Sequence, residues 1–351
     1  EFYQLDFEMS FATQEDVFRV GEEVLTATFE KFAPEGSVVT AAPYPVISYK
    51  QAMLEFGSDK PDLRNPLRIV DVTDFFQRCT FKPFHGQTVR AIKVSNKMSK
   101  GFHEKLLKFA TSIGMGGLGY LEVKEDLSYK GPIDKFIPDD MKAEIREIAG
   151  LKAGDTIFFI ADKEKQAALY AGQLRNELGQ RLDLLEKNAY RFCFINDFPM
   201  YEYDEEQKKI IFTHNPFSMP QGGLEALTTK DPLELLAYQY DIVCNGVELS
   251  SGAVRNHNLD IMVKAFEIAG YTEEDLKEKF GALYNAFQYG APPHAGMAPG
   301  VDRMIMLLRN EENIREVIPF PMNGNAQDVM CGAPNEVSEM QLREVHIKVR
   351  K

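Results

Sequence analysis

The chain has 351 residues, of which 44% are hydrophobic, and its formal net charge is −13. This length exceeds that of one typical domain, so we expect two domains, or one domain with a large insertion. No apolar run approaches the ~20 residues that a membrane-spanning helix needs, and the first residues do not have the basic and apolar blocks of a secretion signal. The acidic balance argues against a general nucleic-acid-binding surface, so any RNA contact must come from local patches or from residues outside the chain.

Four scattered cysteines contain no CxxC pair: Cys79, Cys193, Cys244 and Cys331. This spacing indicates neither a disulfide framework nor a zinc site. A reduced environment fits such cysteines best, so we expect the protein in the cytoplasm, without a membrane partner.

The first 66 residues predict a strand, a helix and a loop. Residues 1–11 alternate between apolar and polar side chains, with Gln4, Asp6, Glu8 and Ser10 on the polar face. Strict alternation is typical of a strand with one buried face. Residues 14–33 repeat apolar positions at helical spacing, and residues 57–66 form a charged, turn-rich segment that reads as an ordered loop or a linker.

From Phe81 to about Leu185 strands and helices alternate. Strands are expected at 89–94, 119–125 and 155–161, separated by helices near 99–112, 138–149 and 164–182. This rhythm indicates a compact α/β module. The glycine-rich residues 114–120 follow a helix and precede a strand, the reverse of the order in a dinucleotide-binding fingerprint, so we interpret them as a flexible turn.

After this module, hairpins and helices alternate to the end of the chain. We therefore predict an α+β fold in which a mainly antiparallel sheet, flanked by helices, is interrupted by a smaller α/β domain. Residues 1–80 and 186–351 form the two parts of the catalytic domain, and residues 81–185 form the insertion.

The hairpin of residues 237–258 contains Asn245-Gly246, a strong signal for a type I′ turn. With these two residues as the loop, Cys244 pairs with Val247, Val243 with Glu248, and Asp241 with Ser250. Asp241 and Glu248 are then diagonal neighbours on one face, and two such carboxylates suit Mg²⁺ that carries ATP phosphates. The alternative is a solvated acidic face.

Two further residues have a functional and a structural interpretation. Arg255 follows the hairpin, where its guanidinium could form a simple salt bridge or bind a substrate carboxylate through two hydrogen bonds. His214 ends a strand and begins the loop NPFSMPQGG. A single histidine at a strand end is more often a surface or hydrogen-bonding residue than a functional one.

The most informative segment is GAPPHAGMAPGVDRMIMLL, residues 290–308. Its glycines let the backbone approach a flat or anionic ligand, and the helix that follows carries Asp302 and Arg303 near its start. The segment resembles the third signature motif of the class II aminoacyl-tRNA synthetases, which holds ATP. A glycine- and proline-rich turn before an ordinary surface helix is the alternative.

The whole chain resembles the bacterial-type aspartyl-tRNA synthetases, a branch of that family. The resemblance is carried, in family order, by FYQLDFEMSF, GSDKPDLRNP, INDFPMYEYD, THNPFSMP, NGVELSSGAVRNHN and GAPPHAGMAPGVDR. It implies the class II synthetase sheet, and it identifies residues 81–185 as the insertion domain of bacterial members. It also implies L-aspartate, ATP and tRNA as substrates, Mg²⁺ as the metal, and a homodimer in the full-length protein.

Residue roles follow from the resemblance alone. It implies that His214 and Arg255 bind aspartate, with Arg255 on the side-chain carboxylate, and that Gln4 and Asp6 line the same pocket. Glu248 and Asp241 match the metal-binding carboxylates, and Glu248 also contacts ATP. The ATP-binding segment is implied to be Gly300, Val301, Asp302 and Arg303. Catalytic roles fall to Arg255, Arg303 and His214.

The resemblance also implies that parts of such proteins lie before Glu1. These are the arginine that binds the α-phosphate, the first class II motif that forms the dimer interface, and an anticodon-binding domain. We therefore expect that the chain is a fragment of a longer protein and that it lacks part of the active site.

The expected activity is that of an aspartate–tRNA ligase, with aspartyl-adenylate as the intermediate, and it leaves open whether tRNA(Asn) is also charged. Two alternatives remain. One is a synthetase-like paralogue that makes an amide through an adenylate. The other is a catalytically dead fold that serves as a binding module.

Overall fold

The structure is a computed structural model that describes residues 2–95 and 98–350. It divides into two compact units: residues 6–299 form one, and the described residues up to Leu5 form the other together with those from Gly300 onward. Each unit is described by itself. Within the described ranges, none of the helices combines the length and the apolar character that crossing a membrane requires.

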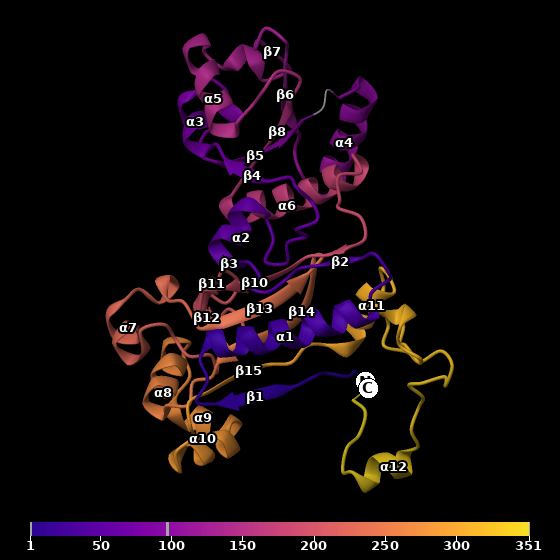
Figure 1. The fold of residues 1–351 in the computed structure, drawn as a ribbon. Coiled ribbons are helices and arrows are strands. Elements are labelled where there is room, and N and C mark those ends of the chain that lie inside the picture. Colours follow the sequence, from indigo (N-terminus) through magenta and orange to yellow (C-terminus); the bar gives the residue numbers. More distant parts are fainter. Residues whose placement is uncertain (1, 96–97, 351) are drawn as a thin grey trace. The chain divides into compact units, whose positions relative to one another are not determined.

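A six-stranded sheet forms the centre of the larger unit (Figure 1), with the strand order β1-β15-β14-β13-β10-β3. All neighbouring strands run antiparallel except β10 and β3, which are parallel. The expected α+β fold with a mainly antiparallel sheet is therefore confirmed. The strands are β1 (Phe7–Ser10), β3 (Val46–Ser48), β10 (Phe192–Asn196), β13 (Gln239–Cys244), β14 (Val247–Val254) and β15 (His294–Met297).

Helix α1 (Gln14–Phe32) packs on one face of this sheet, as Figure 1 shows. Thr13 and Asp16 form a capping box at its start, which satisfies two backbone N–H groups that have no partner inside the helix. Phe18 stacks on Phe194 of β10 at a ring distance of 3.8 Å and meets Tyr240 of β13 edge-on at 5.0 Å. The predicted helix is confirmed, and its apolar side covers the sheet.

Helix α2 (Tyr49–Glu55) packs near the opposite face. Ala52 and Phe56 belong to one buried cluster with Cys193, Ile195 and Val243. Neighbouring residues of a strand point to opposite faces of the sheet. One face therefore packs against α1, and the other packs against α2.

The first strand is shorter than predicted. Alternation extends over residues 1–11, but β1 covers only Phe7–Ser10, because its partner β15 offers only four residues for pairing. Phe11 has a φ of +56° and ends the strand. Tyr3 and Phe11 are 65% and 79% exposed, so the predicted apolar face is not buried among the described residues.

A second, five-stranded sheet lies within residues 69–162, with the strand order β4-β5-β8-β6-β7. Strands and helices occur where the sequence predicts them, but every neighbouring pair is antiparallel. The reason is that β8 lies between β5 and β6, so the strands joined by α4 are not neighbours. The elements are β4 (Ile69–Asp71), α3 (Thr73–Arg78), β5 (Thr88–Val94), α4 (Lys100–Ser112), β6 (Gly119–Val123), β7 (Tyr129–Lys130), α5 (Lys142–Ala149), β8 (Thr156–Asp162) and α6 (Glu164–Arg181).

Buried clusters cover both faces of this second sheet, so it has a core of its own. Strand β4 lies before residue 81, where we expect the insertion to begin. The domain boundaries at 80 and 185 remain a prediction.

The remaining elements surround the six-stranded sheet or belong to the smaller unit. Strands β2 (Val38–Val39) and β9 (Ala189–Tyr190) pair in parallel, and β11 (Tyr201–Asp204) and β12 (Lys209–Phe212) form a hairpin. The other helices of the larger unit are α7 (Gly223–Thr229), α8 (Leu259–Ile268), α9 (Glu273–Lys279) and α10 (Gly281–Gln288). The smaller unit contains α11 (Val301–Leu308) and α12 (Glu339–Glu344).

Candidate active site

The turn between β13 and β14 forms as predicted. Asn245 has a φ of +52° and Gly246 a φ of +85°, as a type I′ turn requires. The Asn245 side chain stabilises the turn, since its Oδ1 accepts from Arg191 N at 2.9 Å and its Nδ2 donates to Ala189 O at 2.9 Å. The predicted pairs Cys244–Val247 and Val243–Glu248 are confirmed.

The next predicted pair is wrong. Asp241 pairs with Ser251 and not with Ser250, because the register shifts between Ile242 and Val243. Leu249 is the extra residue of a bulge on β14, and its side chain is only 1% exposed. Simple counting from the turn cannot find an extra residue on one strand.

Asp241 and Glu248 nevertheless share one face of the sheet. Asp241 lies opposite Ile195, and Glu248 lies opposite Val243. Ile195 and Val243 both pack in the cluster beneath α2. Since paired residues point to the same side, both carboxylates lie on the α2 side, with Asp241 buried and Glu248 half-buried.

Lys60 contacts the candidate site, which the sequence did not reveal. Its Nζ lies 3.2 Å from Glu248 Oε2 and 3.3 Å from Asp59 Oδ2. Burial tends to lower the pKa of Lys60, but the two carboxylates outweigh it and raise the pKa above the usual lysine value. The signal in the sequence was the charged string SDKPD in a turn-rich segment, which we interpreted only as an ordered loop or a linker.

His214 lies beyond the end of β12, next to the same group. Its ring meets Phe198 edge-on at 5.1 Å. Burial lowers the pKa of His214, while Asp59, Lys60 and Glu248 all lie close enough to influence it electrostatically. The lowered pKa favours the neutral imidazole near neutral pH, which can both donate and accept a hydrogen bond.

Arg255 follows β14 and binds a carboxylate from the first strand of the sheet. Its Nε donates to Glu8 Oε1 at 3.0 Å, and Nη2 donates to the same oxygen. Gly296 of β15 lies between the two strands, opposite Glu8 on one side and Ala253 on the other. A Cβ atom on Gly296 would lie 2.5 Å from Glu8 Cδ, so only glycine leaves room for this pair.

The salt-bridge interpretation of Arg255 is thus observed, but it does not exclude substrate binding. A guanidinium has two edges, and Glu8 engages the one formed by Nε and Nη2. The sequence placed Glu8 on the polar face of the first strand without giving it a role. Alternation with Gln4 and Asp6 was the available signal.

The segment predicted to bind ATP lies in the smaller unit. Gly300 is the N-cap of α11, as expected for a loop that runs into a helix. Gln4 forms an isolated bridge with Gly300, and Tyr3 N donates to the carboxylate of Asp302 at 3.0 Å. Arg303 is exposed in the first turn of the helix.

The predicted site residues therefore form two groups, one in each unit. Gln4, Gly300, Val301, Asp302 and Arg303 belong to the smaller unit. The larger unit contains Asp6, His214, Asp241, Glu248 and Arg255. Asp6 is exposed immediately before β1.

Comparison with known proteins identifies the family of the chain. The model of the tRNA synthetases class II (D, K and N) matches residues 1–324. The chain belongs to this family. The resemblance read from its motifs is confirmed.

Several curated relatives of this class II synthetase chain are more than half identical to it. An aspartate–tRNA(Asp/Asn) ligase of Zymomonas mobilis is 56% identical, over 99% of this chain and 59% of its own length. The corresponding ligase of Gluconobacter oxydans is also 56% identical, with the same two coverages. An aspartate–tRNA ligase of Streptomyces avermitilis is 52% identical, over 100% of this chain and 60% of its own length. The chain thus spans about three fifths of these relatives.

Two carboxylates of the hairpin are the candidates for a metal site in this class II synthetase chain. Among the residues that the structure describes, no group of three or more His, Cys, Asp and Glu side chains is arranged to hold a metal. Mg²⁺ at phosphate sites takes one or two protein carboxylates and completes its coordination with phosphates and water. Asp241 and Glu248 offer two carboxylates on the α2 face of the sheet.

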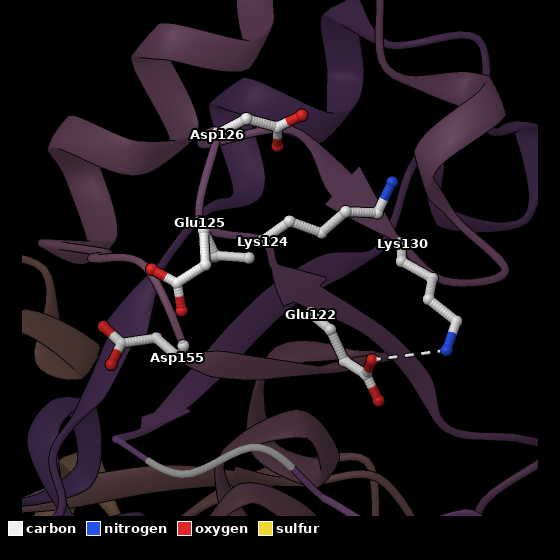
Figure 2. Close-up of a pocket in the computed structure, with 8 residues that line it drawn as sticks. Glu122, Lys124, Glu125, Asp126, Lys130 and Asp155 are labelled. Carbon is white, nitrogen blue, oxygen red and sulfur yellow. Dashed lines mark ion pairs between the residues drawn. The ribbon is translucent and has the colours of Figure 1, made fainter.

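The synthetase has a hollow of about 470 Å³ in its second sheet, away from the predicted residues (Figure 2). Four acidic side chains and two lysines line it, and Lys130 Nζ lies 3.7 Å from Glu122 Oε2. The lining residues are Glu122, Val123, Lys124, Glu125, Asp126, Lys130, Gly154 and Asp155. No residue predicted to bind substrate is among them.

Proposed function

We propose that the full-length protein is an aspartate–tRNA ligase, which activates L-aspartate with ATP and transfers it to the 3′ end of tRNA(Asp). The observation that carries this proposal is the identity of 52–56% with curated aspartate–tRNA ligases over 99–100% of this chain. About two fifths of the length of these relatives is not matched by the chain, so the activity is proposed for the whole protein.

The reaction has two steps. An oxygen of the aspartate α-carboxylate attacks the α-phosphorus of ATP, and the bond from that phosphorus to pyrophosphate breaks, which gives aspartyl-adenylate. The 3′-hydroxyl of the terminal adenosine of tRNA then attacks the aspartyl carbonyl carbon, AMP departs and the hydroxyl proton is released. Little covalent chemistry falls to the protein, so its side chains act by orientation and charge.

Arg255 is proposed to bind the side-chain carboxylate of aspartate through the edge of its guanidinium that Glu8 does not occupy. Glu8 holds the other edge, and this contact fixes the direction in which the guanidinium points. Asparagine would offer Arg255 no charge, and the unmatched guanidinium would disfavour it strongly. His214, Gln4 and Asp6 are proposed to complete the aspartate pocket.

Two sets of residues are proposed to act on the phosphates of ATP. Gly300, Val301, Asp302 and Arg303 would bind ATP, with Arg303 offsetting phosphate charge. Asp241 and Glu248 would hold Mg²⁺, and the bound ion would supply further neutralisation of the phosphates. Arg255, Arg303 and His214 are the side chains proposed to touch the reacting substrates.

The remaining proposals concern partners and organisation. Some of the relatives are named as ligases of both tRNA(Asp) and tRNA(Asn), so we propose tRNA(Asn) as a second acceptor. We also propose that the full-length protein is a cytoplasmic homodimer and that residues 81–185 form its insertion domain.

ATP–pyrophosphate exchange by the full-length protein tests this function. We expect exchange that depends on L-aspartate, does not occur with L-asparagine, and is followed by aspartylation when tRNA is added. Exchange that proceeds without any transfer to tRNA would instead indicate an amide-forming paralogue. No exchange with any amino acid, in a folded preparation, would indicate a binding module.

A further inference from the structure

A buried arginine joins helix α6 to the segment that carries Lys60. Arg175 of α6 is only 1% exposed. Its Nε donates to Leu67 O at 2.8 Å, and its Nη2 donates to Asp62 O at 3.0 Å and to Asn65 O at 2.8 Å. The guanidinium therefore contacts three backbone carbonyl groups of one short loop.

Burying an arginine at this position has a cost in free energy. Burial lowers the pKa of Arg175 to about 10, which reflects the penalty for keeping a charge away from water. An apolar side chain of similar volume would pack the same space without that penalty. What the guanidinium adds is direction, because its planar donors fix where the three carbonyl groups lie.

Other contacts between α6 and this loop are equally close. A Cβ atom on Gly172 would lie 2.5 Å from Gly57 O, so the helix and the loop backbone meet without a side chain between them. The contact is reciprocal at Asn65, whose Nδ2 donates to Arg175 O at 2.9 Å. The loop is therefore held to the helix at its beginning and at its end.

The middle of the same loop meets the hairpin of the candidate active site. Lys60 forms an ion pair with Glu248 at 3.2 Å. Asp62 lies beside the turn, since a Cβ atom on Gly246 would be 3.5 Å from Asp62 Cβ. Contacts thus run without interruption from α6, through residues 57–67, to Glu248.

We propose that Arg175 is a positioning residue that holds residues 57–67 so that Lys60 meets Glu248, and that it thereby couples α6 to the phosphate side of the active site. The coupling itself is a statement about the structure. Its effect on ATP use rests on the proposed function, and the two are tested separately.

Hydrogen exchange of the full-length protein tests the coupling without any reference to activity. Arg175→Met removes the donors but keeps most of the volume, so we expect the backbone amides of residues 57–67 to exchange about tenfold faster or more. Amides of α8 should exchange as in the wild type, because the buried side chains of that helix lie in clusters that contain no residue of α6 or of the loop. Arg175→Lys retains a charged donor and should restore part of the protection.

Pyrophosphate exchange kinetics test the positioning role. Arg175→Met should raise KM for ATP by about three- to tenfold with a smaller change in kcat, and so should Lys60→Met. If both act on Glu248 through one contact, the double variant should be no worse than the poorer single variant. A merely structural role would lower the amount of active enzyme, which reduces kcat and leaves KM unchanged.

Arg181→Met is the matched control, because Arg181 lies on the same helix and its ion pair is with Glu177, one turn away on that helix. It should change neither the hydrogen exchange of the loop nor KM. Unchanged hydrogen exchange of residues 57–67 in Arg175→Met would overturn the coupling. Strictly multiplicative effects of Arg175→Met and Lys60→Met on KM for ATP would overturn the positioning role. If the wild-type protein had no ATP–pyrophosphate exchange activity, only the proposed function would be contradicted. The coupling would still be judged by the hydrogen-exchange result.

Discussion

The carboxylate of Glu8 and the guanidinium of Arg255 meet although 247 residues separate them in the sequence. They lie on the same face of the sheet, with the side-chain-free Gly296 between their strands. The guanidinium of Arg255 is thus held by a carboxylate of the chain itself. This arrangement suits a residue that must present its second edge to another carboxylate in a fixed direction.

Replacing Arg255 with leucine should abolish aspartate activation, because the proposed contact is to the amino acid and not to ATP. Binding of ATP, measured by equilibrium dialysis, should change by less than about threefold. Aspartate-dependent pyrophosphate exchange near the wild-type rate in Arg255→Leu would show that the assignment of Arg255 is wrong.

Two variants of Glu8 distinguish its contribution to aspartate binding from that of Arg255. Glu8→Ala removes the acceptor that orients the guanidinium, so KM for aspartate should rise by about three- to tenfold. Glu8→Gln keeps an oxygen acceptor at the same position and should have a smaller effect. Steady-state pyrophosphate exchange at varied aspartate measures both, with Glu15→Gln on the first turn of α1 as the control. Equal effects of the alanine and glutamine variants would contradict an orienting role.

The carboxylates of the hairpin should set the requirement for Mg²⁺. Asp241→Asn combined with Glu248→Gln should raise the Mg²⁺ concentration needed for half-maximal activation by about tenfold or more, because both negative oxygen ligands are lost. Far-UV circular dichroism should remain that of the wild type. An unchanged Mg²⁺ dependence in the double variant would favour the solvated acidic face over a metal site.

The second sheet should lose stability at acid pH through Asp71. Burial would raise the pKa of Asp71, but hydrogen bonds from Thr73 and the ion pair with Arg90 lower it below 3.8. The unfolded chain therefore takes up the proton first as the pH falls. The stabilisation is fully present above about pH 4 and disappears as the pH drops through the lowered folded value.

Asp71→Asn tests this dependence. At pH 7 it should lower the free energy of local unfolding by about 1 kcal/mol, a modest value because Asp71 is nearly half exposed although Arg90 is buried. Hydrogen exchange of the β5 amides measures the difference, which should shrink towards pH 3. Glu104→Gln, in an exposed ion pair with Lys100, should have little effect at either pH. A difference that stays constant with pH would contradict the role of the Asp71 charge.

The sequence by itself determined those features that depend on neighbouring residues. Apolar spacing gave the range of α1, and the Asn245-Gly246 pair gave the turn and the first two pairs of the hairpin, because both rest on local backbone preferences. The strands and helices of the second sheet were predicted for the same reason. The resemblance of the motifs was sufficient to recognise the family.

Only the tertiary structure decided the contacts between distant segments. The bulge at Leu249 moved the partner of Asp241, and β8 took a place between β5 and β6, because strand pairing is chosen by packing on both faces and not by order in the chain. Glu8 meets Arg255, Lys60 meets Glu248 and Arg175 meets the loop of residues 62–67 across separations of more than 100 residues. Local periodicity has no information at that range, because such contacts form only when the sheet, its helices and its loops are packed together.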